Sequence, residues 1–336
     1  MKLFKKLRVF LTIVVVIVLF LAVVNIIPPK KNVAGENPFI VEKGALPMIA
    51  AHRGGGENYP ENTILAFRGA VEDLGVDILE SDLWLTKDGH LVFNHDGYID
   101  RTSNVNGNIP FADAKARYAK EENRHYICDM TLEELEQYNF GYYFTDSTNT
   151  RVYENETPTK ENGLKIAVFE DVLELFKDND KLLFIVEIKD GGQRGYDAAK
   201  ALSATLEGYP QYQNRVVIGT FHGEVEEELR ENYPHLLRGA SVASAAPFVI
   251  TQYLGVNIFN ESDFACLQIP TEYEIKGITI PLDAKTLVSR AHRRNIAVQY
   301  WTINDEETMH ELIALGCDAI MTDNPKLLKE VLDEYR

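Results

Sequence analysis

The stretch "ILESDLWLTKDGHLVFNHD", residues 78 to 96, places two carboxylates, Glu80 and Asp82, in an otherwise apolar run. Successive side chains of a β-strand alternate between its two faces, so residues two apart point the same way. The Asp-Gly pair between two β-rich runs predicts a two-residue hairpin turn, in which Asp82 pairs with His95. Directly opposed residues share one face of a hairpin. The stretch therefore predicts that Glu80, Asp82 and His95 form one polar cluster.

Further polar side chains follow the ends of other apolar runs. His52 and Arg53 come directly after "PMIAA", and Glu187 and Lys189 end the run "KLLFIVEIK". Taken singly, His52 could be a satisfied core histidine, and the Glu187–Lys189 pair could be a surface ion pair of little consequence. Taken together, these residues predict a site at which several strand ends meet.

The residue types in this set indicate metal-assisted cleavage of a phosphate ester. Three carboxylates supply the hard oxygen ligands that Mg²⁺ or Ca²⁺ prefers, and two histidines beside them are too few to indicate zinc. A pair of histidines can act as general base and general acid, because histidine titrates near neutral pH. Arginine binds phosphate through a bidentate fork and lysine binds it as a point charge. A metal, two basic side chains and two histidines are the components that such a reaction needs.

Two aromatic residues are candidate walls of the same pocket. Phe221 and Trp301 stand at the ends of two further predicted strands. Packing in the hydrophobic core explains each of these residues equally well.

The elements that must position these residues alternate between strands and helices. Apolar or β-rich runs predict eight strands, at 47–52, 76–85, 181–189, 215–221, 237–243, 265–270, 295–301 and 318–323. Helical patterns fall between them, the least regular over 245–257. Strands that alternate with helices pair in parallel, so eight units over this length predict a (β/α)₈ TIM barrel, whose catalytic groups lie at the carboxyl ends of its strands. A doubly wound sheet is the alternative, but the chain has no G-x-G-x-x-G to support it.

One segment interrupts this alternation. Residues 91–96 follow the second strand too closely for a parallel crossover, so we expect them to return antiparallel to it. Residues 97–163 then have weak periodicity, and long connections in barrels are usually functional loops at the mouth. We interpret the insertion as a cap, within one barrel domain that spans residues 47–336.

The first 28 residues differ in composition from the rest. Four basic residues precede a run of 19 uncharged residues from Val9 to Ile27. This length suits one transmembrane helix, and the lack of a small-residue cleavage site favours an uncleaved signal anchor over a cleaved signal peptide. More basic residues lie before the span than directly after it, which places the N-terminus in the cytoplasm and the remainder outside it. Residues 1–28 are then a basic tip and anchor, and residues 29–46 a linker.

The remainder of the chain is strongly acidic. Without the four basic residues before the span it carries 30 basic and 51 acidic residues, a net charge of −21. Such a body repels nucleic acid and anionic lipid surfaces. The expected partners are a phosphodiester substrate, small or derived from lipid, and the membrane that holds the anchor.

Several motifs in this order resemble the glycerophosphodiester phosphodiesterase family. They are "AHRGGGENYPENTILAF", "ESDLWLTKDGHLVFNHDGYIDRT", "TLEEL", "VEIK", "YWTIN" and "DAIMTDNP", and they extend from about Met48 to the carboxyl end. The resemblance implies a TIM barrel with an insertion after the His-Asp motif. It also implies release of an alcohol and glycerol 3-phosphate, through attack by a neighbouring substrate hydroxyl and a cyclic phosphate that water opens.

Carried over by position, the resemblance assigns a role to seven residues. It makes His52 and His95 the acid–base pair. It makes Glu80, Asp82 and Glu187 the ligands of one divalent cation, Ca²⁺ or Mg²⁺. Arg53 and Lys189 would hold the phosphate.

Three short segments depart from the family pattern and leave the choice of alcohol open. They are "AVFED" for P-T-L-E-E, "TF" for S-F and "TDNP" for T-D-R-P. Two other functions remain as alternatives. One is a lysophospholipase D-type activity on lipid headgroups at the same site, and the other is a catalytically silent, membrane-tethered binding module.

Overall fold

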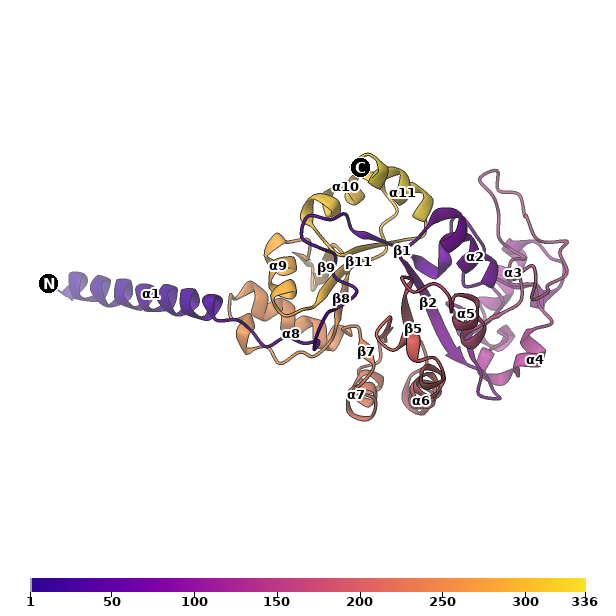
Figure 1. Cartoon of the computed structure of the whole chain (residues 1–336), viewed down its shortest axis with the longest axis horizontal. Coiled ribbons are helices and arrows are strands. Elements are labelled where there is room, and N and C mark those ends of the chain that lie inside the picture. The colour runs from indigo at the N-terminus through magenta and orange to yellow at the C-terminus, as the bar shows by residue number, and fades with distance from the viewer. Residues whose placement is uncertain (1) are drawn as a thin grey trace.

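A barrel of eight parallel strands forms the centre of the molecule (Figure 1). The computed structural model describes residues 2–336, with side-chain exposure from Phe4 onward. Neighbouring strands run in the order β7-β6-β5-β2-β1-β12-β11-β8. A single bridge between Gly239, just after β7, and Cys266 of β8 joins the two ends of this order. The predicted (β/α)₈ barrel is therefore confirmed.

All eight predicted barrel strands are present, although several are shorter than their apolar runs. They are β1 (Met48–Ala51), β2 (Ile78–Leu85), β5 (Leu183–Ile188), β6 (Val216–Gly219), β7 (Leu237–Arg238), β8 (Cys266–Ile269), β11 (Ala297–Tyr300) and β12 (Ala319–Thr322).

Helices follow these strands and cover the outside of the barrel (Figure 1). They are α2 (Ile64–Gly69), α6 (Gly192–Gly208), α7 (Gly223–Asn232), α8 (Val242–Tyr253), α9 (Lys285–Arg293), α10 (Glu306–Leu315) and α11 (Pro325–Asp333), together with α5 (Phe169–Leu175) ahead of β5. Sequence patterns missed one feature, an exposed hairpin of β9 (Glu272–Ile275) and β10 (Ile278–Pro281) between β8 and α9.

Strand alternation turns the acidic residues of β2 and β5 toward the inside of the barrel. Ile78, at the start of β2, packs in the interior cluster, whereas Leu79 and Leu83 pack in the layer between the strands and the helices. Because Glu80 and Asp82 keep the spacing of two from Ile78, they continue the interior face toward the mouth. The interior face of β2 thus changes from apolar to acidic side chains on the side of the barrel mouth.

The hairpin after β2 has a different register from the predicted one. β3 (Leu91–Phe93) pairs Leu91 with Leu85 and Phe93 with Leu83, which sets Asp82 opposite Asn94 instead of His95. The reason is a three-residue loop in place of two residues. Gly89 in this loop has φ +89°, the left-handed conformation that closes such loops and that glycine adopts without strain. His95 reaches the mouth because the strand ends at Phe93.

Residues 97–163 fold as a compact cap beside the mouth. They contain α3 (Phe111–Tyr118) and the single turn α4 (Leu132–Leu135), with one small apolar cluster of their own and a second that they share with β3 and β4. The short strand β4 (Ala167–Val168) then pairs with β3 and returns the chain to the barrel. Figure 1 shows the cap at one end of the molecule and the N-terminal helix at the other.

The N-terminal helix α1 (Lys2–Ile26) projects from the body (Figure 1). Its segment Phe4–Ile26 is long and apolar enough to cross a membrane, and a signal sequence would share these properties. Farther along the chain, residues 37–41 lie across the amino ends of three strands. Asn37 donates hydrogen bonds to the carbonyls of Ala265 and Asn295, and the Val41 N–H donates to Asp318.

Phe39, in this crossing segment, fills the bottom of the barrel. Its side chain is fully buried in the interior cluster. We expect Phe39→Ala to lower the free energy of unfolding by about 3–5 kcal/mol, through lost burial and a residual cavity. Urea unfolding of the full chain in detergent would measure this. Phe111→Ala, at a position 41% exposed on the cap, is the control and should cost less than about 1 kcal/mol. An equal loss in both variants would contradict the role of Phe39.

Candidate active site

Three carboxylates, two buried and one half-buried, meet at the mouth of the barrel. Glu80 is 4% exposed and Asp82 is 1% exposed, and Glu187 is held among them on the neighbouring strand β5. The parallel register sets Asp82 beside Glu187. One oxygen from each of the three side chains lies within 4.8 Å of the other two. The arrangement brings together the three residues that the sequence predicts as metal ligands.

Two basic side chains partly balance this negative charge. The Lys189 Nζ lies 2.9 Å from the Glu187 Oε1 and 3.3 Å from the Asp82 Oδ1. The Arg53 Nε lies 3.5 Å from the Asp82 Oδ2. Burial alone would raise the pKa of Asp82, but the charges of Lys189 and Arg53 lower it overall. Asp82 is therefore ionised at neutral pH.

Glu80 has less compensation than Asp82. Its Oε2 accepts a hydrogen bond from the Arg53 backbone N–H at 2.9 Å. Burial nevertheless raises its pKa to about 7, against the opposing charge of His52. Burial likewise raises the pKa of Glu187, against the opposing effects of Lys189 and His95. The cluster is thus short of positive charge.

The donor set fits a hard divalent cation. Three carboxylates face two cationic side chains, and Arg53 also contacts a fourth carboxylate, Glu61, at 3.4 Å. All the potential ligand atoms in the cluster are oxygens, which suits Mg²⁺ or Ca²⁺ better than zinc. A bound cation would supply the missing positive charge.

A tight turn after β1 carries His52 and Arg53 into the mouth. Arg53 has φ +54°, a conformation uncommon for residues other than glycine, and Gly54 follows with φ +79°. A Cβ atom on Gly54 would lie 2.9 Å from the side chains of Ala66 and Phe67. Glycine is therefore needed at position 54 for the turn to pack against α2.

His52 is held by an aspartate from the last strand. Its Nδ1 lies 2.6 Å from the Asp323 Oδ1, and its Nε2 lies 3.9 Å from Glu80. An Nδ1–H that donates to Asp323 leaves the Nε2 to face the carboxylate cluster. Burial alone would lower the pKa of His52, but Glu80 and Asp323 raise it above its ordinary value. The geometry favours the charged imidazolium.

His95 has a similar aspartate partner. Its Nδ1 lies 3.1 Å from the Asp96 Oδ1. The other carboxylate oxygen of Asp96, Oδ2, accepts a hydrogen bond from the Arg101 Nε at 2.5 Å. Arg101 also donates two hydrogen bonds to Glu61, at 2.6 and 2.8 Å, and Glu61 contacts Arg53. An ion-pair chain therefore links the cap residue Arg101 to both sides of the site.

Sequence reasoning missed the partners that orient the two histidines. The sequence patterns give no role to Asp323, Asp96 or Arg101, although each stands inside a quoted motif, "TDNP" or "NHDGYIDRT". Thr63 is the N-cap of α2, and the preceding Asn62 donates a hydrogen bond to Asp82 at 3.0 Å.

The two predicted aromatic walls lie together beside Lys189. The rings of Phe221 and Trp301 meet edge to face with centroids 6.0 Å apart, and the Lys189 Nζ lies 5.9 Å from the Phe221 centroid. Phe221 is 55% exposed, whereas Trp301 also packs on the interior cluster. Next to the site, a cleft of about 740 Å³ separates the cap from the β1–α2 loop, and Glu61 and Arg101 line it.

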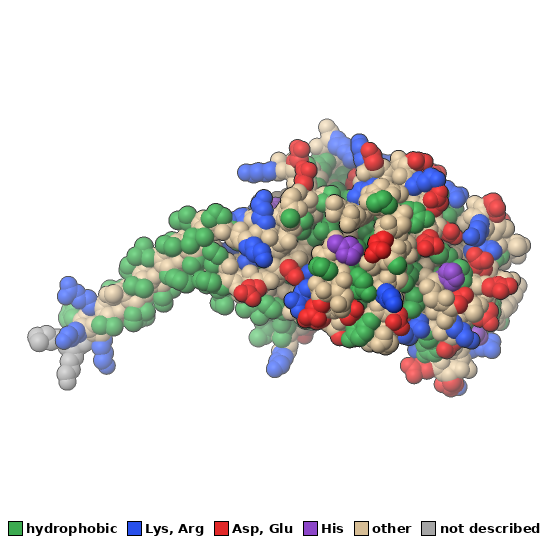
Figure 2. Space-filling view, turned by 60° about the horizontal axis from the view of Figure 1, so that its bottom comes forward, with side chains coloured by type: hydrophobic (Ala, Val, Ile, Leu, Met, Phe, Trp, Pro, Cys, Tyr) green, Lys and Arg blue, Asp and Glu red, His purple; other side chains and the backbone are tan. Residues whose placement is uncertain are grey.

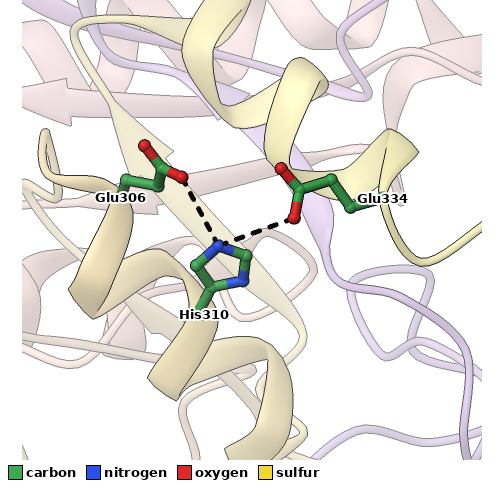
Figure 3. A group of neighbouring side chains, drawn as sticks. All are labelled: Glu306, His310 and Glu334. Carbon is green, nitrogen blue, oxygen red and sulfur yellow. Dashed lines mark ion pairs between the residues drawn. The ribbon is translucent and has the colours of Figure 1, made fainter.

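A second group of possible metal ligands lies on the outer helices. Figure 3 shows the His310 ring between Glu306 and Glu334, with its Nε2 3.7 Å and 3.9 Å from their carboxylates. Both glutamate side chains are 61% exposed. Exposed carboxylates stay hydrated and do not need a cation for charge balance, so this group lacks the feature that favours a cation at the barrel mouth.

Comparisons with known proteins point to one family. A model of the glycerophosphoryl diester phosphodiesterase family matches residues 52–327. A glycerophosphodiester phosphodiesterase of Caldanaerobacter subterraneus is 30% identical over 281 residues, which cover 84% of this chain and 96% of that protein. Lysophospholipase D GDPD3 of Mus musculus is 25% identical over 305 residues, covering 85% and 82% of the two chains.

Solved structures show the same fold. A putative glycerophosphoryl diester phosphodiesterase from Silicibacter pomeroyi has a TM-score of 0.65 at 18% identity, and the match covers 90% of this chain and 98% of that one. A phosphodiesterase from Oleispira antarctica, in complex with the product sn-glycerol-3-phosphate, has a TM-score of 0.59 at 21% identity, covering 86% and 97%.

The pKa of Glu80 leads to a prediction about metal affinity. A cation at the cluster must displace the proton of Glu80 below about pH 7. We expect the affinity for Ca²⁺ or Mg²⁺ to fall by up to about tenfold per pH unit below 7 and to level off above it. Isothermal titration of the full chain in detergent, at pH 5.5, 6.5 and 8.0, measures this. The same affinity at all three values would contradict the coupling.

Proposed function

This chain belongs to the glycerophosphoryl diester phosphodiesterase family and is a phosphoric diester hydrolase, and from that premise we propose that one divalent cation and two histidines carry out its reaction. The substrates are glycerophosphodiesters, and the products are glycerol 3-phosphate and an alcohol. The observation that carries the proposal is the group of three carboxylates, two of them buried, flanked by two histidines that each contact an aspartate.

Glu80, Asp82 and Glu187 would hold the cation. When bound, the cation would neutralise negative charge on the phosphate and act as a Lewis acid. Arg53 and Lys189 would bind the phosphate oxygens, the former through its fork and the latter as a point charge. Phe221 and Trp301 would form a wall against the apolar parts of the substrate.

His52 and His95 would exchange protons with the substrate through their Nε2 atoms. Glu80 and Asp323 raise the pKa of His52, which suits it to protonate the oxygen of the departing alcohol. His95 would accept the proton of the neighbouring substrate hydroxyl as that oxygen attacks phosphorus. The roles then reverse. His52, now neutral, takes a proton from water, and His95 returns its proton to the ring oxygen as the cyclic phosphate opens.

The N-terminal helix α1 would anchor this enzyme in a membrane. Residues 1–28 would form the cytoplasmic tip and the single span, residues 29–46 the connection, and residues 47–336 the catalytic domain outside the cytoplasm, with the insertion at 97–163. The apolar length of Phe4–Ile26 supports the span, and the basic residues before it support this orientation.

A second candidate substrate is the headgroup linkage of a lysolipid. The similarity to the mouse lysophospholipase D favours this activity, which would use the same residues. A silent binding module is less well supported. Binding alone does not require two histidines that are each oriented by an aspartate.

The test follows the release of glycerol 3-phosphate from soluble glycerophosphodiesters by the full chain in detergent. We expect a chelator to abolish release and either Ca²⁺ or Mg²⁺ to restore it. Lysolipid in mixed micelles, assayed in parallel, should react more slowly. Faster reaction of the lysolipid would favour the second candidate, and release that is insensitive to chelator would contradict the proposal.

Two variants separate metal binding from proton transfer. Asp82→Asn should lose both the bound metal and turnover, whereas His95→Ala should keep the metal and lose about 10²–10⁴-fold in rate. Metal loss in His95→Ala, or full activity in Asp82→Asn, would show that the roles are wrongly assigned. Glu334→Gln, in the exposed outer group, is the control and should behave as wild type.

A further inference from the structure

Helix α8 differs from the other outer helices in the chemistry of its surface. It contains no charged residue, and its exposed positions are all apolar or aromatic: Val242, Ala243, Ala246, Pro247, Ile250 and Tyr253. The exposed positions of α7 and α10, by contrast, include several glutamates. A surface helix whose exposed face is apolar normally packs against something besides water.

The apolar residues of this region continue beyond the end of α8. Leu254 is 64% exposed, Phe259 62% and Ile250 57%. We call these three residues the apolar tip. The tip stands next to α1. The Phe259 ring stacks on Phe20 of α1 with centroids 6.4 Å apart, and the Asn25 amide donates a 2.8 Å hydrogen bond to the Gly255 carbonyl.

The tip lies at the end of the barrel opposite the active site. α8 connects β7 to β8 and runs back along the outside of the barrel, so its last turn is at the amino ends of the strands. Residues 37–41, which follow α1, bond to the backbone just before β8 and β11 and to the Asp318 side chain just before β12. The carboxylates and histidines stand instead where strands end. Figure 1 shows the same separation, with α1 and the cap at opposite ends of the molecule.

Basic side chains surround the junction between α1 and the body. Lys30, Lys31 and Arg293 are exposed there, and Arg293 donates a hydrogen bond to the Ile27 carbonyl. Figure 2 shows basic side chains where the apolar surface of α1 meets an otherwise strongly acidic body. Basic side chains next to an apolar surface suit the interface of a membrane with anionic lipids.

We propose that the apolar tip rests in the surface of the bilayer that α1 spans, so that the active-site mouth opens away from that membrane. The inference rests on the proposed anchor. We take lipid to be what covers the apolar tip, because the tip lies next to a helix with the length and composition of a transmembrane span. The consequence concerns substrate: the enzyme receives diesters from the aqueous side, and lipids of its own bilayer lie at the wrong end of the barrel.

Spin labels on the full chain test this arrangement in vesicles of phosphatidylethanolamine and phosphatidylglycerol. In a Cys128→Ser background, nitroxides are attached at Leu254→Cys, Phe259→Cys, Val16→Cys and Phe111→Cys, the last being an exposed apolar control on the cap. Power saturation with oxygen and a water-soluble nickel chelate reports the depth of each. We expect Val16 in the hydrocarbon core, Leu254 and Phe259 at the headgroup boundary, and Phe111 in water.

Each of the following labelling results would contradict a different part of the proposal. A label at Val16 in water rejects the anchor itself. A deep label at Val16 with Leu254 and Phe259 in water rejects only the docking. A label at Phe111 that lies in lipid would show that the cap faces the membrane, which is the opposite orientation. Protection of Leu254 that persists in detergent and grows with protein concentration identifies a second copy as the occupant. Turnover of a soluble diester within about twofold of wild type verifies that the Leu254→Cys and Phe259→Cys variants are folded.

Discussion

The crowding of three carboxylates side by side is the constraint on which the rest of the site depends. Glu80 and Asp82 are buried with Glu187 half-buried beside them, and removing such charges from water is costly unless they are paired. Lys189 and Arg53 supply only part of the balancing charge, which leaves Glu80 with a pKa of about 7. A bound cation would complete the balance, so the same arrangement that is unfavourable for the metal-free fold is suited to binding a metal.

The surroundings of this cluster are organised to present two histidines to it. Aspartates from opposite directions hold them: Asp323 follows the last barrel strand, and Asp96 follows β3. Arg101 of the cap then joins Asp96 to Glu61, and Glu61 contacts Arg53. The cap is therefore part of the electrostatic support of the site. The N-terminal helix α1, in contrast, joins the barrel at its far end and leaves the mouth unobstructed.

The sequence was sufficient for features that follow from local periodicity. Eight strands and the inward direction of Glu80, Asp82 and Glu187 follow from apolar runs and from the spacing of two. The hairpin register was wrong because an Asp-Gly pair is compatible with both two- and three-residue loops, and the chain places Gly89 at the end of the longer one. Asp323 and Arg101 were missed because their contacts lie 271 and 40 residues away along the chain, and no local pattern encodes such distances.

Counting bound cations in two matched variants would show directly whether the carboxylates at the barrel mouth hold a divalent cation. Equilibrium dialysis of the full chain against Ca²⁺ or Mg²⁺ at pH 8 would compare Glu80→Gln/Glu187→Gln with Glu306→Gln/Glu334→Gln, both verified as folded by circular dichroism. We predict about one cation per chain in the wild type and in the outer variant, and none in the barrel variant. Wild-type binding by the barrel variant, with loss in the outer one, would contradict the account.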